Sequence, residues 1–386
     1  MTPLPAMETA ARADRLRQRL PEAGCDALLV TRLANIRYLS GFTGSAGLLL
    51  VLPDELVFVS DGRYRDQSAE ELAAAGVDAR IEIRPGEAGQ REVLAARATG
   101  LDRFGLEAGD VTWAAQRRYR DEWFPAAELV PTVGLVEGLW AVKDEGEVAR
   151  LAEAARVADA ALAAVRSRLA EEPTEREFGL ELDSAMRRLG AEDVSFESIV
   201  ASVPNGAKPH ARPTGRRIRE GDLVVLDFGA LVDGYHSDMT RTVAVGEPSP
   251  TQRRMLQVVA ESQAAGVAAV SAGVACADVD AACRDVIVAA GLGEAFLHGT
   301  GHGVGLDIHE DPRVAANSTD TLAVGHVVTV EPGVYLPENG GVRIEDTVVV
   351  TPNGCRPLTL APKEPAVGEG TPPGPHHCEH KDPTSA

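Results

Sequence analysis

The sequence predicts two domains of different fold class, a smaller α/β domain over residues 1–137 and a larger α+β domain over residues 138–363. In the first part, short apolar runs alternate with helical patterns, which is typical of a mixed sheet with covered faces. A long alanine-rich helical pattern beginning at Glu145 marks the change to the second part. There, two stretches of one design, Gly221–Thr242 and Gly325–Thr347, predict a pseudo-twofold domain in which helices back a curved antiparallel sheet.

Length, charge and cysteine content exclude several classes of protein. A chain of 386 residues can form two or three cores. Its formal net charge of −20 argues against nucleic acid or an anionic membrane as a partner, because both require a basic surface. The sequence has no uninterrupted apolar stretch of about 18 residues, so no membrane span is expected. The five cysteines are scattered, and their odd number resists a complete disulfide framework, so we expect a reducing cytoplasm.

The first domain is expected to open with a helix and continue through three strands. The amino-terminal pattern predicts an amphipathic helix over Thr9–Leu20. Apolar runs predict strands over Asp26–Thr31, Gly47–Leu52 and Glu55–Ser60. Asp61–Tyr64 supplies a turn, and a helix rich in Ala and Glu follows it.

The second domain is expected to place pairs of helices before each of its two repeated stretches. Thr174, with Glu177 three residues later, forms a capping-box pattern at the start of one helix. The other expected helices are Glu145–Leu169, Thr251–Ala272 and Cys276–Ala290. Residues 364–386 hold Pro, Gly, His and charge with nothing to bury, which predicts a disordered tail without a preorganised metal site.

Four carboxylates occupy matched places in the two repeated stretches. Asp227 and Glu331 each end a β-branched run and stand two residues before a glycine. Asp238 and Glu345 follow after a Gly-containing connection, so each stretch predicts a hairpin in which antiparallel pairing can bring its two acids opposite each other. A buried strand seldom carries a carboxylate, because removing an unpaired one from water costs more than one hydrogen bond returns. Four such groups therefore need positive charge, and divalent metal is the simplest source.

The residues around these acids suit a dinuclear hydrolytic site. Between the hairpins, a glycine-rich run carries His298, His302 and His309. Carboxylates with one imidazole suit Mn²⁺, Co²⁺, Fe²⁺ or Zn²⁺, and we expect two such ions, manganese first. Four carboxylates would neutralise two divalent ions and leave a bridging water acidic enough to attack at neutral pH. Arg343 lies two residues before Glu345, which makes it a clamp on a metal ligand or a substrate contact.

The chain resembles the pita-bread metallopeptidases, a family that includes methionine aminopeptidase, Xaa-Pro aminopeptidase, prolidase and the metal-free creatinase. The resemblance rests on the acid spacing and on the run His298–Glu310, and it covers roughly residues 5–362. Asn35–Phe42 and Ser60–Tyr64 resemble a creatinase-type N-terminal domain, which points to the Xaa-Pro aminopeptidase and prolidase branch. Ser195–Ser202, leading to His210, also matches that branch.

The resemblance implies a role for each acid in the metal site. Asp227 and Asp238 would be ligands from the first hairpin, with Asp238 bridging the two ions. His302 and Glu331 would bind one ion, and Glu345 would bridge. Glu331 would also shuttle a proton for the attacking water.

The resemblance also implies a substrate side of the site. His210 and His309 would orient the substrate and stabilise the tetrahedral intermediate. His298 would line the pocket for proline, and Arg313 matches a position that contacts a substrate carboxylate in some prolidase-like members. Family resemblance further implies a homodimer.

These roles predict an exopeptidase that cleaves the Xaa–Pro bond of proline-containing peptides. We favour an Xaa-Pro aminopeptidase, because no recognisable feature closes the pocket around a dipeptide. Arg313 supports the alternative, an Xaa-Pro dipeptidase or prolidase. Creatinase chemistry is disfavoured because all five metal ligands are present, and the same completeness argues against a non-catalytic peptide-binding module.

Overall fold

The computed structural model describes residues 3–367, and these form two compact units. The first runs from residue 3 to Ala149 and includes Gly305–Asp311; the second takes in Arg150–Val304 and Pro312 to residue 367. This division falls beyond the boundary expected at residues 137/138, which stays a prediction. None of the described helices is both long and apolar enough to cross a membrane.

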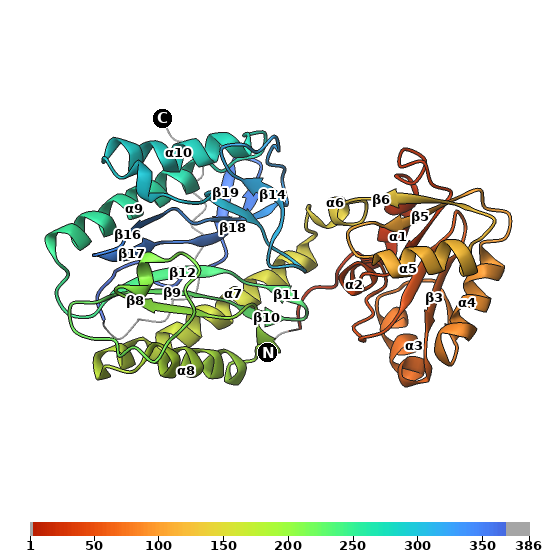
Figure 1. Ribbon diagram of the computed structural model, residues 1–386, viewed down its shortest axis with the longest axis horizontal. Coiled ribbons are helices and arrows are strands. Elements are labelled where there is room, and N and C mark those ends of the chain that lie inside the picture. Colours follow the sequence, from red (N-terminus) through yellow and green to blue (C-terminus); the bar gives the residue numbers. More distant parts are fainter. Residues whose placement is uncertain (1–2, 368–386) are drawn as a thin grey trace, which may run out of the picture. The chain divides into compact units, whose positions relative to one another are not determined.

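The first unit is built on a mixed six-stranded sheet, as predicted (Figure 1). Its strands are β1 (Ala27–Val30), β2 (Leu48–Val51), β3 (Leu56–Ser60), β4 (Arg80–Ile83), β5 (Arg103–Glu107) and β6 (Glu128–Thr132), in the order β4-β3-β2-β1-β5-β6. The pairs β1–β2 and β2–β3 are antiparallel, and the other pairs are parallel. The three strands expected from apolar runs are β1, β2 and β3.

Helices connect the strands of this sheet. They are α1 (Arg12–Arg17), α2 (Leu33–Ser40), α3 (Arg65–Ala74), α4 (Gly86–Arg97), α5 (Trp113–Arg118) and α6 (Glu137–Trp140). The helix expected over Thr9–Leu20 is shorter, because residues 9–11 form a 3₁₀ turn and α1 ends at Arg17. All residues of β1 and β3 are buried, so the strand interiors form the core of the unit.

The second unit contains four long helices and a set of antiparallel strands. The helices are α7 (Glu145–Val165), which belongs to this unit from Arg150 on, α8 (Glu175–Arg188), α9 (Pro250–Ala269) and α10 (Cys276–Ala289). The strands are β7 (Asp193–Val194), β8 (Ile199–Ser202), β9 (Leu223–Phe228), β10 (Ala230–Val232), β11 (Tyr235–His236), β12 (Met239–Ala244), β13 (Gly301–Gly303), β14 (Glu310–Val314), β15 (Val327–Val330), β16 (Gly333–Leu336), β17 (Gly340–Arg343), β18 (Asp346–Thr351) and β19 (Gly354–Pro357). The predicted capping box is present at Thr174 and Glu177.

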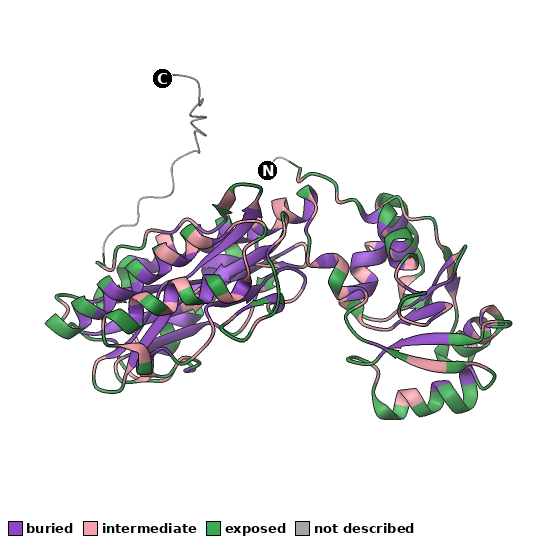
Figure 2. Cartoon of the chain, turned by 90° about the horizontal axis from the view of Figure 1, so that it is seen from above, coloured by how far each residue is buried: buried purple, intermediate pink, exposed green. Residues whose placement is uncertain are grey.

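Each half of the second unit packs two helices against its own hairpin, which confirms the predicted pseudo-twofold design. One core joins α7 and α8 to β9 and β12 through residues such as Leu162, Phe178 and Leu226. The other joins α9 and α10 to β15 and β18 through residues such as Val259 and Val348. Figure 1 shows α7 and α8 on one side of the sheets and α9 and α10 on the other. Figure 2 shows that the strands between them are almost entirely buried.

The two acidic hairpins share a plan but differ in register. In each, the long strands pair antiparallel, β9 with β12 and β15 with β18, and a short ribbon interrupts them. Asp227 pairs with Thr240, so Asp238 lies diagonal to Asp227. The spacing had led us to expect the two acids opposite each other. Glu331 and Glu345 directly follow and precede the pair Val330–Asp346, which places them across from each other. The predicted opposition of acids therefore holds only for the second hairpin.

The chain continues as paired structure a little beyond Lys363, where the tail was expected to begin. The backbone amide of Ala244 donates to the carbonyl of Pro365 at 2.7 Å, and Ala366 forms a parallel bridge with Ala244. Arg166 donates to carbonyls of this segment, and Val367 packs against the first core. The segment is ordered because these bonds satisfy its backbone groups. The rest of the predicted tail, residues 368–386, lies outside the described residues.

Candidate metal centre

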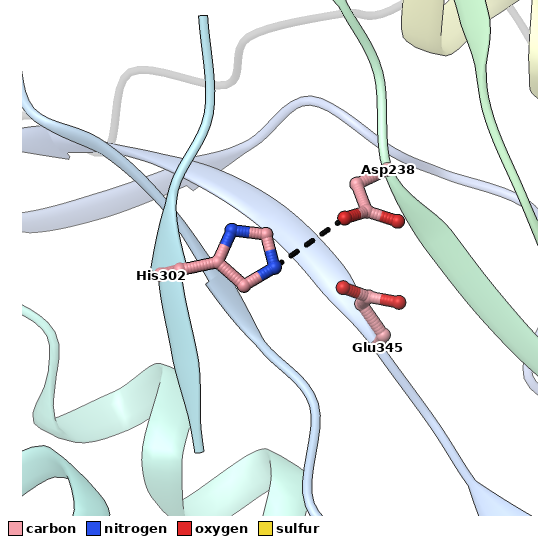
Figure 3. A group of neighbouring side chains, drawn as sticks. All are labelled: Asp238, His302 and Glu345. Carbon is pink, nitrogen blue, oxygen red and sulfur yellow. Dashed lines mark ion pairs between the residues drawn. The ribbon is translucent and has the colours of Figure 1, made fainter. Parts of the chain in front are cut away.

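Three buried side chains from separate strands meet at one point of the second unit. Asp238 precedes β12, His302 is the middle residue of β13, and Glu345 precedes β18. Each offers one ligand atom, and these atoms lie within 4.8 Å of one another. Figure 3 shows the three groups pointing toward a common space, with His302 Nε2 3.5 Å from Asp238 Oδ2. Glu331 joins them, since its Oε1 lies 3.4 Å from His302 Nε2.

The carboxylates of this cluster disfavour one another's charge. Burial raises the pKa of Asp238 well above its usual range, and the charges of Glu345 and Asp227 raise it further. Burial likewise raises the pKa of Glu345, with Glu331 and Asp227 adding to the shift. The pKa of Glu331 is raised to about 7, chiefly by burial and against the opposing charge of Arg343. A set of buried acids that repel one another calls for a cation.

Asp227 stands at the edge of the cluster and is shared with an arginine. Its Oδ2 accepts a hydrogen bond from Arg343 Nη2. Its Oδ1 is buried and has no hydrogen-bond partner within the part of the chain that the structure describes. A buried carboxylate oxygen without a donor is costly, and a metal ion would satisfy it.

Arg343 connects several parts of the site at the end of β17. Its Nε donates to Thr240 Oγ1 at 3.0 Å, and its Nη1 donates to the hydroxyl of Tyr335 at 2.7 Å and to the carbonyl of Pro209 at 3.2 Å. Burial opposes its charge, but Tyr335, Asp227 and nearby acids raise its pKa well above the ordinary value, so it stays cationic.

The two threonines that follow the second acids cross between the hairpins. Thr240, on the first hairpin, donates from Oγ1 to Glu345 Oε2 at 2.6 Å. Thr347, on the second hairpin, donates from Oγ1 to the carbonyl of Asp238 at 2.8 Å. Each half thus supports an acid of the other half, a contact between distant segments that the sequence does not reveal.

Tyr335 is a functional candidate that sequence reasoning missed. Its hydroxyl lies 2.9 Å from His298 Nε2, and His298 Nδ1 lies 2.8 Å from the carbonyl of Gly299. Because Arg343 donates to the same hydroxyl, the hydroxyl donates to Nε2 and Nδ1 carries the ring proton. Burial lowers the pKa of His298 to about 4, so the ring is neutral. In the ribbon, Tyr335 pairs with Gly341, two residue pairs from the pair Gly333–Arg343, and this register, which the sequence does not specify, puts Tyr335 and Arg343 on one face.

The remaining candidate residues lie on exposed segments. His210 is exposed on the loop after β8, and its charge is among the causes that lower the pKa of His298. Arg313 is exposed on β14, and its charge is among those that lower the pKa of Glu331. His309 is exposed on the segment Gly305–Asp311, which groups with the first unit.

The donor set fits divalent metal. It consists of carboxylate oxygens and one imidazole, a mixture that suits first-row divalent ions. His302 Nδ1 lies 3.0 Å from the carbonyl of Gly303, which leaves Nε2 turned toward the acids. This pattern, in which the second ring nitrogen is fixed by a carbonyl, is typical of metal-binding histidines. Asp227 Oδ1, which accepts no hydrogen bond from the described residues, adds a further possible ligand atom.

Comparison with known protein families decides the assignment. The model of Metallopeptidase family M24 matches residues 149–352, and the model of the Creatinase/Prolidase N-terminal domain matches residues 12–142. The chain belongs to Metallopeptidase family M24. This confirms the predicted fold, a pita-bread domain preceded by a creatinase-type domain, and the membership of the Xaa-Pro branch. Family membership implies a metal-dependent peptidase.

Individual relatives agree along almost the whole chain. An Xaa-Pro dipeptidase of Pyrococcus furiosus is 33% identical over 92% of this chain and 99% of its own length. The structure of an Xaa-Pro dipeptidase from Bacillus anthracis matches with a TM-score of 0.88 at 41% identity, covering 92% of this chain and 98% of that one. An X-Pro aminopeptidase from Thermotoga maritima matches with a TM-score of 0.84 at 32% identity, covering 92% and 99%.

Proposed function

We propose that this M24 peptidase is an Xaa-Pro dipeptidase that hydrolyses the bond before proline. The sequence alone favours an aminopeptidase. Its alternative has more support from relatives, since a protein described as an Xaa-Pro dipeptidase is 41% identical and one described as an X-Pro aminopeptidase is 32% identical. The observation that carries hydrolysis itself is the buried cluster of Asp238, His302 and Glu345.

We further propose that Asp227, Asp238, His302, Glu331 and Glu345 hold two divalent ions, most readily Mn²⁺. The bound ions would polarise the scissile carbonyl and lower the pKa of water. The acids divide by exposure: the side chain of Asp238 is 6% exposed, whereas that of Glu331 is 19% exposed. Glu331 is therefore the acid best suited to take a proton from the attacking water and give it to the departing proline nitrogen.

The surroundings of His298 suit a proline ring. The ring is neutral, packs edge-on against Phe296 with centroids 5.2 Å apart, and tilts against Tyr335 at 5.5 Å. A wall of uncharged rings favours an apolar pyrrolidine ring over a polar side chain. We assign substrate binding and stabilisation of the tetrahedral intermediate to His210 and His309. His210 is among the groups that lower the pKa of His298.

Arg313 and Arg343 complete the proposed substrate side. Arg313 is exposed, and its charge is among those that lower the pKa of Glu331. Its guanidinium would pair with a substrate carboxylate on the proline side. In a dipeptide, proline carries the free carboxylate, whereas in a longer peptide it carries a neutral amide. Arg343 would hold Asp227 and the carbonyl of Pro209 in place.

The proposal extends to the domain bounds, the assembly, the compartment and the substrates. We keep residues 1–137 and 138–363 as the two domains, a homodimer as the assembly and the cytoplasm as the compartment. Proline-containing peptides are the proposed substrates, with no nucleic acid or membrane partner.

The experiment that tests the proposal compares two substrates on metal-free enzyme supplied with Mn²⁺, Co²⁺ or Zn²⁺. We expect rapid hydrolysis of an Xaa-Pro dipeptide and slow hydrolysis of the matching Xaa-Pro-Yaa tripeptide. Preferential cleavage of the tripeptide would return the assignment to an aminopeptidase.

A further inference from the structure

The loop that carries His210 is fastened at both ends to one buried side chain. The loop leaves β8 at Ser202 and returns to the body of the unit at Thr214. Glu175, the first residue of α8, is fully buried beneath it. The amide and hydroxyl of Ser202 donate to Glu175 Oε1 at 2.8 and 2.7 Å, and the amide and hydroxyl of Thr214 donate to Oε2 at 3.0 and 2.6 Å.

Asn205 adds a third point of attachment within the loop. Its Nδ2 donates to both oxygens of Glu175, at 3.2 and 2.9 Å. Burial raises the pKa of Glu175, but the hydrogen bonds from Thr214 and Ser202 outweigh burial and hold it below its usual value. The buried carboxylate is therefore ionised at neutral pH, and a charge with several donors binds them more strongly than a neutral acceptor would.

The opposite side of the loop lies against the metal centre. The carbonyl of Pro209, next to His210, accepts from Arg343 Nη1 at 3.2 Å. Gly206 packs so closely on β17 that a Cβ at Gly341 would overlap its carbonyl oxygen. The loop is thus held between Glu175 and the strand that carries Arg343, and its backbone has little room to shift.

We propose that Glu175 is a positioning residue for His210, which holds both ends of the loop so that the imidazole meets the substrate. This inference rests on the proposed function, because it takes His210 as a substrate contact. The side-chain oxygens of Glu175 accept from Ser202, Asn205 and Thr214, so its influence on the site passes through the loop.

The test compares Glu175→Gln with Glu177→Gln. Both substitutions remove one negative charge from the first turn of α8, but among the described residues Glu177 bonds to Thr174 alone, in the capping box, a role that Gln also fills. We expect Glu175→Gln to lower kcat about 10- to 100-fold, since small displacements of a substrate-contacting group cost this much. Bound metal per chain should stay at the wild-type level, and Glu177→Gln should keep the wild-type kcat.

A double variant separates positioning from a general loss of structure. If Glu175 acts through His210, Glu175→Gln should slow the His210→Ala enzyme by less than about twofold, because the positioned group is already gone. An equal loss in both backgrounds would overturn the proposal, as would a wild-type kcat in Glu175→Gln or a loss of metal from it.

A second variant and the choice of substrate allow the test to give a result even if Glu175→Gln does not fold or the substrate preference differs from the proposal. If Glu175→Gln does not fold, Thr214→Val removes one hydroxyl donor at the end of the loop and should lower kcat roughly 2- to 10-fold by the same route. The rates are measured on whichever Xaa-Pro peptide the wild-type enzyme cleaves. A preference for tripeptides would thus remove the dipeptidase assignment without changing the coupling between Glu175 and His210.

Discussion

The acid hairpins and the His210 loop place their functional groups in different ways. Asp238 and Glu345 are buried beside long antiparallel ladders, and hydrogen bonds from the opposite hairpin hold them. His210 is exposed on a loop, and its position depends on Glu175, a residue of a helix that precedes it in the chain. The ladder supplies rigidity for metal ligands, whereas the loop needs a separate anchor. Changes in the hairpins should therefore remove metal, and changes in the loop should remove turnover alone.

The largest effect is expected from Glu345→Ala, which removes a buried ligand from the second hairpin. Activity should fall by several orders of magnitude, and at least one metal per chain should be lost, because the remaining acids cannot neutralise two ions. Metal analysis and initial rates check this, with Glu338→Ala, an exposed acid of the same region, as control. Near-normal turnover would mean that Glu345 is not a ligand.

The next effect concerns the histidines and separates chemistry from metal binding. His309→Ala should keep both metals but lose about 10²- to 10³-fold in kcat, the usual cost of removing one donor to a developing oxyanion. Metal content and kcat are measured on the same preparation. A collapse of metal content would mean that His309 is a ligand. Metal binding would then not be confined to the acid hairpins.

A smaller effect should distinguish the two crossing threonines. Thr240→Val removes a hydrogen bond to the carboxylate of Glu345, so metal affinity should weaken roughly 10- to 100-fold. Thr347→Val removes a bond to the backbone carbonyl of Asp238, which should cost stability of about 1 kcal/mol and change metal affinity less. Metal titration and thermal unfolding compare them. Equal losses of metal affinity would show that both threonines act by fixing the strands that carry the ligands, and that the hydrogen bond to the Glu345 carboxylate has no special role.

The smallest effect is expected at Arg313. Because this side chain is exposed, its pairing with a dipeptide carboxylate should be worth about 1 kcal/mol, and Arg313→Ala should raise KM for an Xaa-Pro dipeptide roughly 5-fold. KM for the matching tripeptide should hardly change. Parallel increases for both substrates would assign Arg313 a structural role.

The sequence predicts the acid hairpins because local spacing determines most of their geometry. A β-branched run, an acid, a glycine and a returning acid are all readable, and the helix pairs follow from periodicity. The register is not readable: Asp227 pairs with Thr240, which a one-residue change in the connection would alter. The predicted opposition of Asp227 and Asp238 failed for this reason.

Long-range contacts explain what the sequence does not predict. Tyr335 reaches His298 only because the ribbon of β16 and β17 folds beside the loop before β13. The crossing bonds of Thr240 and Thr347 depend on how two hairpins more than a hundred positions apart meet. In the sequence, Glu175 resembles any exposed acid in the first turn of a helix. Only the fold brings both ends of the His210 loop into contact with its carboxylate.

The most direct test of the proposed metal centre is a titration of metal-free enzyme with Mn²⁺, in which bound ions per chain and the rate of Xaa-Pro dipeptide hydrolysis are measured together. We expect no hydrolysis without metal and a rate that reaches its plateau when two ions are bound per chain. Full hydrolysis by the metal-free enzyme would contradict the assignment of the acid hairpins as a metal centre.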